Sequence, residues 1–72
     1  MLPTVRIIGP YRCFFFANEA GEPPHIHVER DRCVAKLWLR PVAVASSQRF
    51  PSHELRVVEA TVVANAAGVL EA

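Results

Sequence analysis

The amino-acid sequence predicts an α+β fold, in which an antiparallel sheet of about four short strands is covered on one face by a single C-terminal helix. Three observations support this prediction. Of the prolines and glycines, only Gly68 lies beyond Pro51, so turn-forming residues gather in the first two-thirds of the chain. Residues 25–39 alternate between apolar and polar side chains, which is typical of strands with one buried face. The residues after Ser52 instead repeat their apolar side chains at helical spacing.

The predicted strands lie between turn-forming residues. A short apolar run at residues 5–8 stops at Gly9-Pro10, and the aromatic side chains of residues 11–17 favour a central strand. The dipeptide Arg40-Pro41 interrupts pairing, because proline lacks a backbone donor. We therefore predict strands at residues 11–17, 25–30, 33–39 and 42–45, with polar loops at residues 18–24 and 46–51.

One helix is predicted to follow Ser52, whose side chain suits the N-cap position. Several β-branched residues between Val57 and Val63 lower the helix propensity, but this segment does not alternate cleanly, as a strand would. We expect Gly68 to weaken the last turn. The apolar stripe that should cover the sheet consists of Leu55, Val58, Val62, Ala66 and Val69.

Residues 23–39 predict a hairpin with a defined register. If Asp31-Arg32 forms the tip, a two-residue or a four-residue loop gives the same facing pairs, whereas a three- or five-residue loop would shift them. The pairs are Val28 with Ala35, Ile26 with Leu37, His25 with Trp38, His27 with Lys36 and Glu29 with Val34. Because side chains alternate across a strand, the two faces differ. One face holds Ile26, Val28, Cys33, Ala35, Leu37 and Leu39, and the other holds His25, His27, Glu29, Lys36 and Trp38.

Length and composition exclude several classes of protein. The 72 residues suffice for one small domain, residues 1–72, and 51% hydrophobic residues exclude a disordered chain. A formal net charge of +1 is too balanced for the basic field of a dedicated nucleic-acid-binding protein. Apolar runs such as Cys13 to Phe16 are too short to cross a membrane. Two cysteines form no disulfide framework, so we expect a cytoplasmic protein, and its small core favours self-association or a partner.

The polar hairpin face is the candidate binding site, because one helix covers only one face of a small sheet. His25 and His27 lie two positions apart on one strand and could converge on a metal ion. The residues that could supply a third ligand are Glu29, His53 and Cys13. Lys36, expected opposite His27, disfavours a cation and favours an anion, and no spacing matches a structural zinc pattern. We predict that this face binds a partner or an anionic group, through His25, His27, Glu29, Lys36 and Trp38. The pattern implies no cofactor and no metal. A simpler interpretation is that the two histidines are solvent-exposed strand residues without a binding role.

A catalytic interpretation of the same face is the alternative. In a small hydrolase or ribonuclease, His25 or His27 would act as the general base. Lys36 or Arg30 would then stabilise charge on a phosphate. Cys33 should face the core, and Cys13 lies in an aromatic strand, so neither thiol is predicted to be a nucleophile.

Two further surfaces bear on partners. The aromatic residues could stack on RNA bases beside the arginines, but nearby acidic residues cancel much of the positive field, so nucleic acid is not favoured. On the helix, a second line of small residues would let another helix approach closely and form a homo-oligomer. Alanine is also simply the best helix former at exposed positions. This helix seam consists of Val57, Ala60, Ala64 and Ala67.

Several motifs together resemble one protein family. They are Pro3-Thr4-Val5, Ile8-Gly9-Pro10-Tyr11, Phe14-Phe15-Phe16, Glu22-Pro23-Pro24-His25-Ile26-His27-Val28, Ala35-Lys36-Leu37-Trp38-Leu39, Pro41-Val42 and Glu54-Leu55. The pattern resembles the small bacterial domain-of-unknown-function 4160 family over nearly the whole chain. The family's motif positions would be Pro24, His25, His27, Val28, Ala35 and Lys36. Similar chains usually end their helix with a tryptophan beyond the position of Ala72, so we expect either an unanchored helix end or a shortened sequence.

The resemblance implies a short cytosolic protein with no established reaction. Genes of this family often lie beside a second small domain of unknown function, numbered 2442, in an arrangement like a toxin–antitoxin pair. We therefore expect a non-enzymatic interaction module, a component of such a pair, whose partner is a small protein encoded nearby and which does not contact a membrane.

Overall fold

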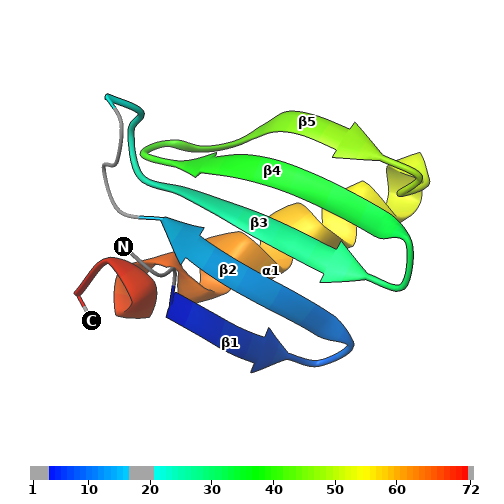
Figure 1. Cartoon of the computed structure of the whole chain (residues 1–72), viewed down its shortest axis with the longest axis horizontal. Coiled ribbons are helices and arrows are strands. Elements are labelled where there is room, and N and C mark those ends of the chain that lie inside the picture. Colours follow the sequence, from blue (N-terminus) through cyan, green and yellow to red (C-terminus); the bar gives the residue numbers. More distant parts are fainter. Residues whose placement is uncertain (1–3, 17–20, 72) are drawn as a thin grey trace.

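The computed structural model describes residues 4–16 and 21–71 of the chain. Its five-stranded antiparallel sheet has the order β1-β2-β3-β4-β5, so every strand pairs with its neighbour in the sequence. One helix, α1, crosses a single face of the sheet (Figure 1). The elements are β1 (Thr4–Ile8), β2 (Tyr11–Phe16), β3 (His25–Arg30), β4 (Cys33–Leu39), β5 (Val42–Gln48) and α1 (Ser52–Glu71). The α+β prediction is confirmed, with five strands in place of about four.

The two differences in strand extent concern the sheet edges. The apolar run at residues 5–8 forms the edge strand β1, which pairs with β2 throughout its length. Residues 46–48 were predicted as loop, and this was wrong, because β5 continues to Gln48. The register shifts between Lys36 and Leu37, so Ala45 is the extra residue of a β-bulge and pairing resumes at Ser46. Polar residues are tolerated there because Ser46, Ser47 and Gln48 are exposed to solvent.

The predicted register of the β3–β4 hairpin is confirmed at every pair. Val28 lies opposite Ala35, and His27 lies opposite Lys36. Asp31 at the tip has a φ of 54°, a left-handed conformation that aspartate tolerates better than most residues. The β1–β2 turn uses Gly9 in the same region, with a φ of 58°. The β4–β5 turn contains a cis peptide bond between Arg40 and Pro41.

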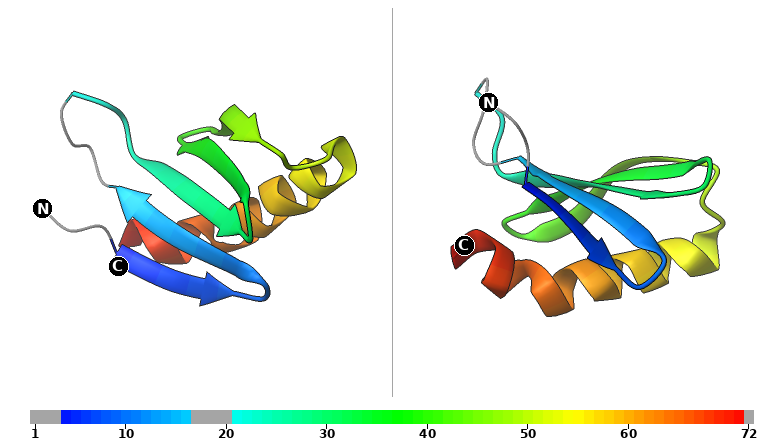
Figure 2. Two further views of the ribbon diagram at one scale, coloured as in Figure 1. Left: turned by 45° about the vertical axis from the view of Figure 1, so that its right-hand side comes forward. Right: turned by 60° about the horizontal axis from the view of Figure 1, so that its bottom comes forward.

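The hydrophobic core lies between α1 and the adjacent sheet face. Val58 and Val62 of the predicted helical stripe are 1% and 3% exposed, and Leu55 packs beside them. The side chain of Val69 is outside the described residues. Figure 2 shows α1 along one side of the sheet, with the other face uncovered among the described elements. The buried hydrophobic residues are Tyr11, Cys13, Phe15, Ile26, Val28, Ala35, Leu37, Leu39, Phe50, Val58 and Val62.

The N-cap of α1 lies one residue earlier than predicted. The Pro51 carbonyl accepts hydrogen bonds from the backbone N–H groups of Glu54 and Leu55, so Pro51 and not Ser52 occupies the N-cap position. Ser52 is instead the first helical residue. In the part of the chain that the structure describes, no helix is long and apolar enough to span a membrane.

Candidate functional site

The sheet face away from α1, which we call the open face, carries the five residues predicted for binding. His25, His27 and Glu29 alternate with buried residues along β3, and Lys36 and Trp38 do so along β4. Their partners across β2 are Phe16, Phe14 and Arg12, which therefore share this face. The hairpin geometry that the sequence predicted is thus present. Whether the residues bind anything stays a prediction.

An aromatic cluster, formed by Phe16, His25, His27 and Trp38, lies on the open face where β2 ends and β3 begins. The ring centroids of Phe16 and His25 are 5.0 Å apart with an interplanar angle of 9°, a stacked arrangement. His27 is tilted against both, at 4.9 Å from Phe16 and 5.4 Å from His25. Trp38 meets His25 edge-on at 5.9 Å. Each contact lies within the range of favourable aromatic pairs, so the cluster holds its own side chains in place.

His25 is the most constrained member of the cluster. It is 6% exposed, and its Nδ1 lies 3.0 Å from the carbonyl oxygen of Pro23. A carbonyl only accepts, so Nδ1 carries the hydrogen in this contact. The loop before β3 is also held by a bond from the backbone N–H of Leu39 to the carbonyl of Pro24. The Pro-Pro-His motif therefore anchors this loop to the sheet.

Lys36 is occupied by contacts within the chain. Its Nζ donates a 2.9 Å hydrogen bond to Glu22 and lies 4.6 Å from the centroid of the Trp38 ring. The hydrogen bond from Lys36 and its positive charge hold the pKa of Glu22 below its usual range. Burial, together with the nearby charges of His25 and Lys36, lowers the pKa of His27. This part of the open face thus combines the Lys36–Glu22 ion pair with the imidazole of His27, which favours its neutral form.

The candidate third metal ligands do not join the two histidines. Cys13 is 1% exposed and faces α1, on the opposite side of the sheet. His53 is exposed on the first turn of α1, which belongs to the other layer. Only Glu29 shares the open face with the histidine pair. Among residues 4–16 and 21–71, no group of three or more His, Cys, Asp or Glu side chains is arranged to hold a metal ion.

Arg30 lies on the covered face, which corrects its predicted role beside the histidines. Its guanidinium donates to both carboxylate oxygens of Glu54, at 2.6 and 2.7 Å, and the hydroxyl of Tyr11 donates to the same carboxylate at 3.1 Å. Arg30 and Tyr11 lower the pKa of Glu54 through these bonds, and Glu54 raises the pKa of Arg30. Burial, and then the bond to Glu54, raise the pKa of Tyr11. This arginine–carboxylate clasp joins the end of β3 to the first turn of α1, and it places Arg30 out of reach of a phosphate bound on the open face.

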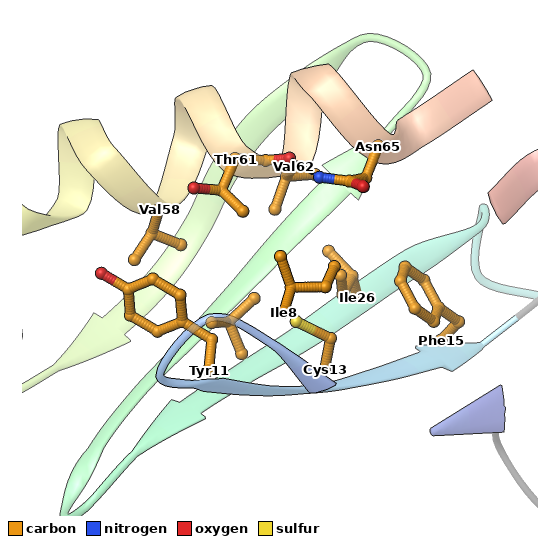
Figure 3. A pocket seen from close by; sticks show the side chains of 10 residues that line it. Ile8, Tyr11, Cys13, Phe15, Ile26, Val58, Thr61, Val62 and Asn65 are labelled. Atoms are coloured by element: carbon orange, nitrogen blue, oxygen red, sulfur yellow. Dashed lines mark hydrogen bonds between the residues drawn. The ribbon is translucent and has the colours of Figure 1, made fainter. Parts of the chain in front are cut away.

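The space between sheet and helix offers little room for a ligand. A cavity of about 10 Å³, roughly the size that admits one water molecule, lies among Cys13, Ile26 and the helical residues Val62 and Asn65 (Figure 3). Burial raises the pKa of Cys13, so this thiol stays protonated and packs as a core residue, as predicted. Cys33 lies on the predicted covered face but is only partly buried, with its Sγ 3.5 Å from the carbonyl oxygen of Arg49.

The open face also includes residues of β1 that the sequence analysis did not assign to it. Val5 and Ile7 of β1 lie opposite Phe14 and Arg12, and they are 55% and 64% exposed. The sequence contained the information needed to assign them. The period-two alternation that was used for residues 25–39 places both β1 residues on this face when it is applied across the Gly9-Pro10 turn. On α1, Val57, Ala60 and Ala64 of the helix seam are exposed, while the side chain of Ala67 is outside the described residues.

The fold and its open face define a class of protein: a small sheet-and-helix domain with one buried face and one solvent-facing, aromatic face. Within that class, the family model described as "Domain of unknown function (DUF4160)" matches residues 11–72. The chain therefore belongs to the DUF4160 family, as its motifs suggested. The matched range includes the aromatic cluster, Glu22 and Lys36, whereas the motif residues Pro3 to Pro10 precede it. No curated protein and no solved structure matches the chain.

Proposed function

We propose that the protein is a non-enzymatic interaction module that binds a partner protein through its open face. The observation that carries this proposal is a sheet face, uncovered among the described elements, on which the aliphatic Val5 and Ile7 are exposed and the aromatic Phe14, Phe16 and Trp38 are half-buried. Exposed apolar groups of this kind mark interaction surfaces when they form a contiguous patch. The patch runs from Val5 and Ile7 through Phe14 and Phe16 to Trp38.

The charges of this face favour a protein over an anionic ligand. Lys36 already has a carboxylate and an aromatic ring as partners. Arg12 lies opposite Glu29 across the β2–β3 pair, so positive and negative groups alternate over the surface. A phosphate or RNA backbone approaching the ammonium of Lys36 would be repelled by the adjacent carboxylate of Glu22, which already neutralises that charge. Aromatic side chains with a polar rim are instead typical of the centre of a protein interface.

The partner we propose is the small protein encoded beside this one, in a toxin–antitoxin-like pair acting in the cytoplasm. The support is the gene arrangement that the family resemblance implies, together with the surface described above. Two small chains made from adjacent genes are produced together and can cover each other's exposed apolar residues.

Co-expression with the neighbouring gene tests the proposal. We expect the two proteins to co-purify, and Trp38→Ala to weaken their association, because a buried tryptophan at an interface often contributes 2 kcal/mol or more, roughly a 30-fold change in affinity. Lys36→Glu should also weaken it, because it places a second carboxylate beside Glu22. Val63→Ala is the control, since Val63 is 58% exposed on α1. Independent elution of the two wild-type proteins would refute the proposal.

A ribonuclease is the alternative function. The neutral form favoured at His27 is what a general base requires. Against it, Arg30 points to the other face and Lys36 is paired, so neither is free to stabilise a phosphate. Purified protein incubated with RNA decides the matter. Cleavage that disappears on replacing His25 and His27 together, with thermal stability retained, would establish the enzyme in place of the interaction module.

A further inference from the structure

The edge strand β1 presents an unpaired row of backbone groups. It pairs only with β2, and no described element lies beyond it in the sheet (Figure 1). Free edges of this kind can accept another strand, and many proteins protect them with proline, a bulge or inward-facing charge. In β1 the inward-facing charge is that of Arg6, which an added strand has to neutralise. β1 is free of bulges, because its pairing with β2 is continuous from Thr4 to Ile8. Its two open-face side chains, Val5 and Ile7, are more than half exposed.

The charged side chains of the two outermost strands, β1 and β2, have one sign. Within β1 and β2 the only charged residues are Arg6 and Arg12, and both are exposed. Arg6 lies opposite the buried Cys13, so it projects on the helix side, while Val5 and Ile7 project on the open face. Arg6 has no ion-pair partner among the described residues. A strand added here would therefore meet apolar, basic and apolar positions in succession.

The other edge of the sheet is less suited to an added strand. β5 contains the bulge at Ala45, which divides its pairing with β4 into two short parts. Bulges bend and twist an edge strand and so oppose further pairing. The second part of β5 is the polar sequence Ser46, Ser47 and Gln48. β1 combines three features that do not occur together at β5. They are continuous pairing with the neighbouring strand, exposed apolar side chains and an unpaired positive charge.

We propose that β1 binds an extended segment of a partner protein, whose side chains follow an apolar–acidic–apolar pattern, as an additional strand of the sheet. The apolar side chains of the segment pack against Val5 and Ile7, and its carboxylate pairs with Arg6. Backbone hydrogen bonds supply affinity in such strand addition, and alternate side chains supply specificity. This inference rests on the proposed function and deepens it. It specifies how the partner that binds the open face also binds the sheet edge, through an extended segment that pairs with β1.

A second copy of the chain fits this edge less well than an acidic segment does. In a two-fold antiparallel pair that uses the whole of Thr4–Ile8, the central residue Arg6 faces its own copy. Directly opposed like charges are destabilising. A register shifted by two positions in either direction avoids that contact but leaves only three residues of each strand paired. The charge of β1 thus favours a different, acidic partner.

The experiment titrates the full-length protein with two capped peptides, Ser-Thr-Val-Glu-Val-Thr-Ser and its counterpart with Lys in place of Glu, and follows backbone amide shifts by NMR. At low salt we expect the Glu peptide to shift the β1 amides and to bind at least threefold more tightly than the Lys peptide. An exposed ion pair changes affinity by only a few-fold. Arg6→Glu should reverse the preference. Ile7→Thr, which keeps a β-branched side chain, should weaken binding at least threefold, and the equally exposed Val63→Thr should not.

Three outcomes of the titration would overturn the inference. They are equal binding of the two peptides, shifts centred on β5, and no shift of β1 amides at the highest soluble peptide concentration. A dimer in sedimentation that Ile7→Thr dissociates would assign the edge to a second copy instead. The proposed function is judged separately by co-purification. A complex that Trp38→Ala weakens and Ile7→Thr leaves intact would support the open face and refute the role of the edge.

Discussion

Replacement of Leu37 by alanine tests the assignment of the covered face most directly. Leu37 is 0% exposed and lies opposite Ile26, directly beneath α1. A buried Leu→Ala change costs about 2–5 kcal/mol, because it removes the transfer free energy of the side chain and leaves a cavity. A chain of 72 residues has a free energy of unfolding of about 4–11 kcal/mol. The substitution should therefore remove a large part of the total stability.

Urea denaturation followed by circular dichroism measures this effect. With a slope of about 1 kcal/mol per molar urea for a small domain, the midpoint should fall by about 2 M or more. Ile7→Ala is the matched control: Ile7 is 64% exposed on the other face, so its loss should change stability by about 0.5 kcal/mol or less. If Leu37→Ala does not fold, Ile26→Val gives a milder test, with an expected loss of about 0.5–1.5 kcal/mol. Equal midpoint shifts for Leu37→Ala and Ile7→Ala would refute the assignment of buried and open faces.

Four further outcomes are expected. Tyr11→Phe should lower the free energy of unfolding by about 1 kcal/mol, because it removes a hydrogen bond to the carboxylate of the clasp; an unchanged thermal melt would contradict that bond. The lowered pKa of His27 means that the unfolded chain binds a proton at this imidazole more readily than the folded chain does. The free energy of unfolding should therefore be greatest above about pH 6.5 and fall as the pH decreases from there, with a slope well under about 1.4 kcal/mol per pH unit. Urea melts of the His27→Leu variant should lack this decrease. A thiol reagent should modify the partly exposed Cys33 in the native protein and Cys13 only after unfolding, as mass spectrometry would detect; equal rates would contradict the burial of Cys13. If the helix seam mediates a homo-oligomer, Ala64→Glu should shift the sedimentation coefficient toward that of the monomer, and an unchanged value would exclude the seam.

The sequence predicted the central hairpin well because its information is local. A short tip at Asp31-Arg32 and the period-two pattern define every pair from His25–Trp38 to Arg30–Cys33. The helix was predictable for the same reason, since Val58 and Val62 lie on one stripe at helical spacing. In both cases, neighbouring residues alone decide which side chains share a face.

The remaining features depend on contacts between distant residues. Arg30 was expected to serve the histidines, yet it pairs with Glu54, whose position becomes known only once α1 is docked on the sheet. Lys36 was expected to attract an anion, but Glu22, 14 residues earlier, occupies it through the loop before β3. The extension of β5 to Gln48 also escaped prediction, because a bulge changes the side-chain alternation that identifies a strand.

The order of the elements has a consequence for synthesis on the ribosome. The five described strands precede α1, so the hairpins emerge and can pair before this twenty-residue helix is complete. Until α1 has been made, no helix of the same chain shields the apolar sheet face that includes Ile26 and Leu37. A nascent chain stalled before Ser52 would expose that layer to chaperones and to other nascent chains, so translation of α1 is the step that shields it.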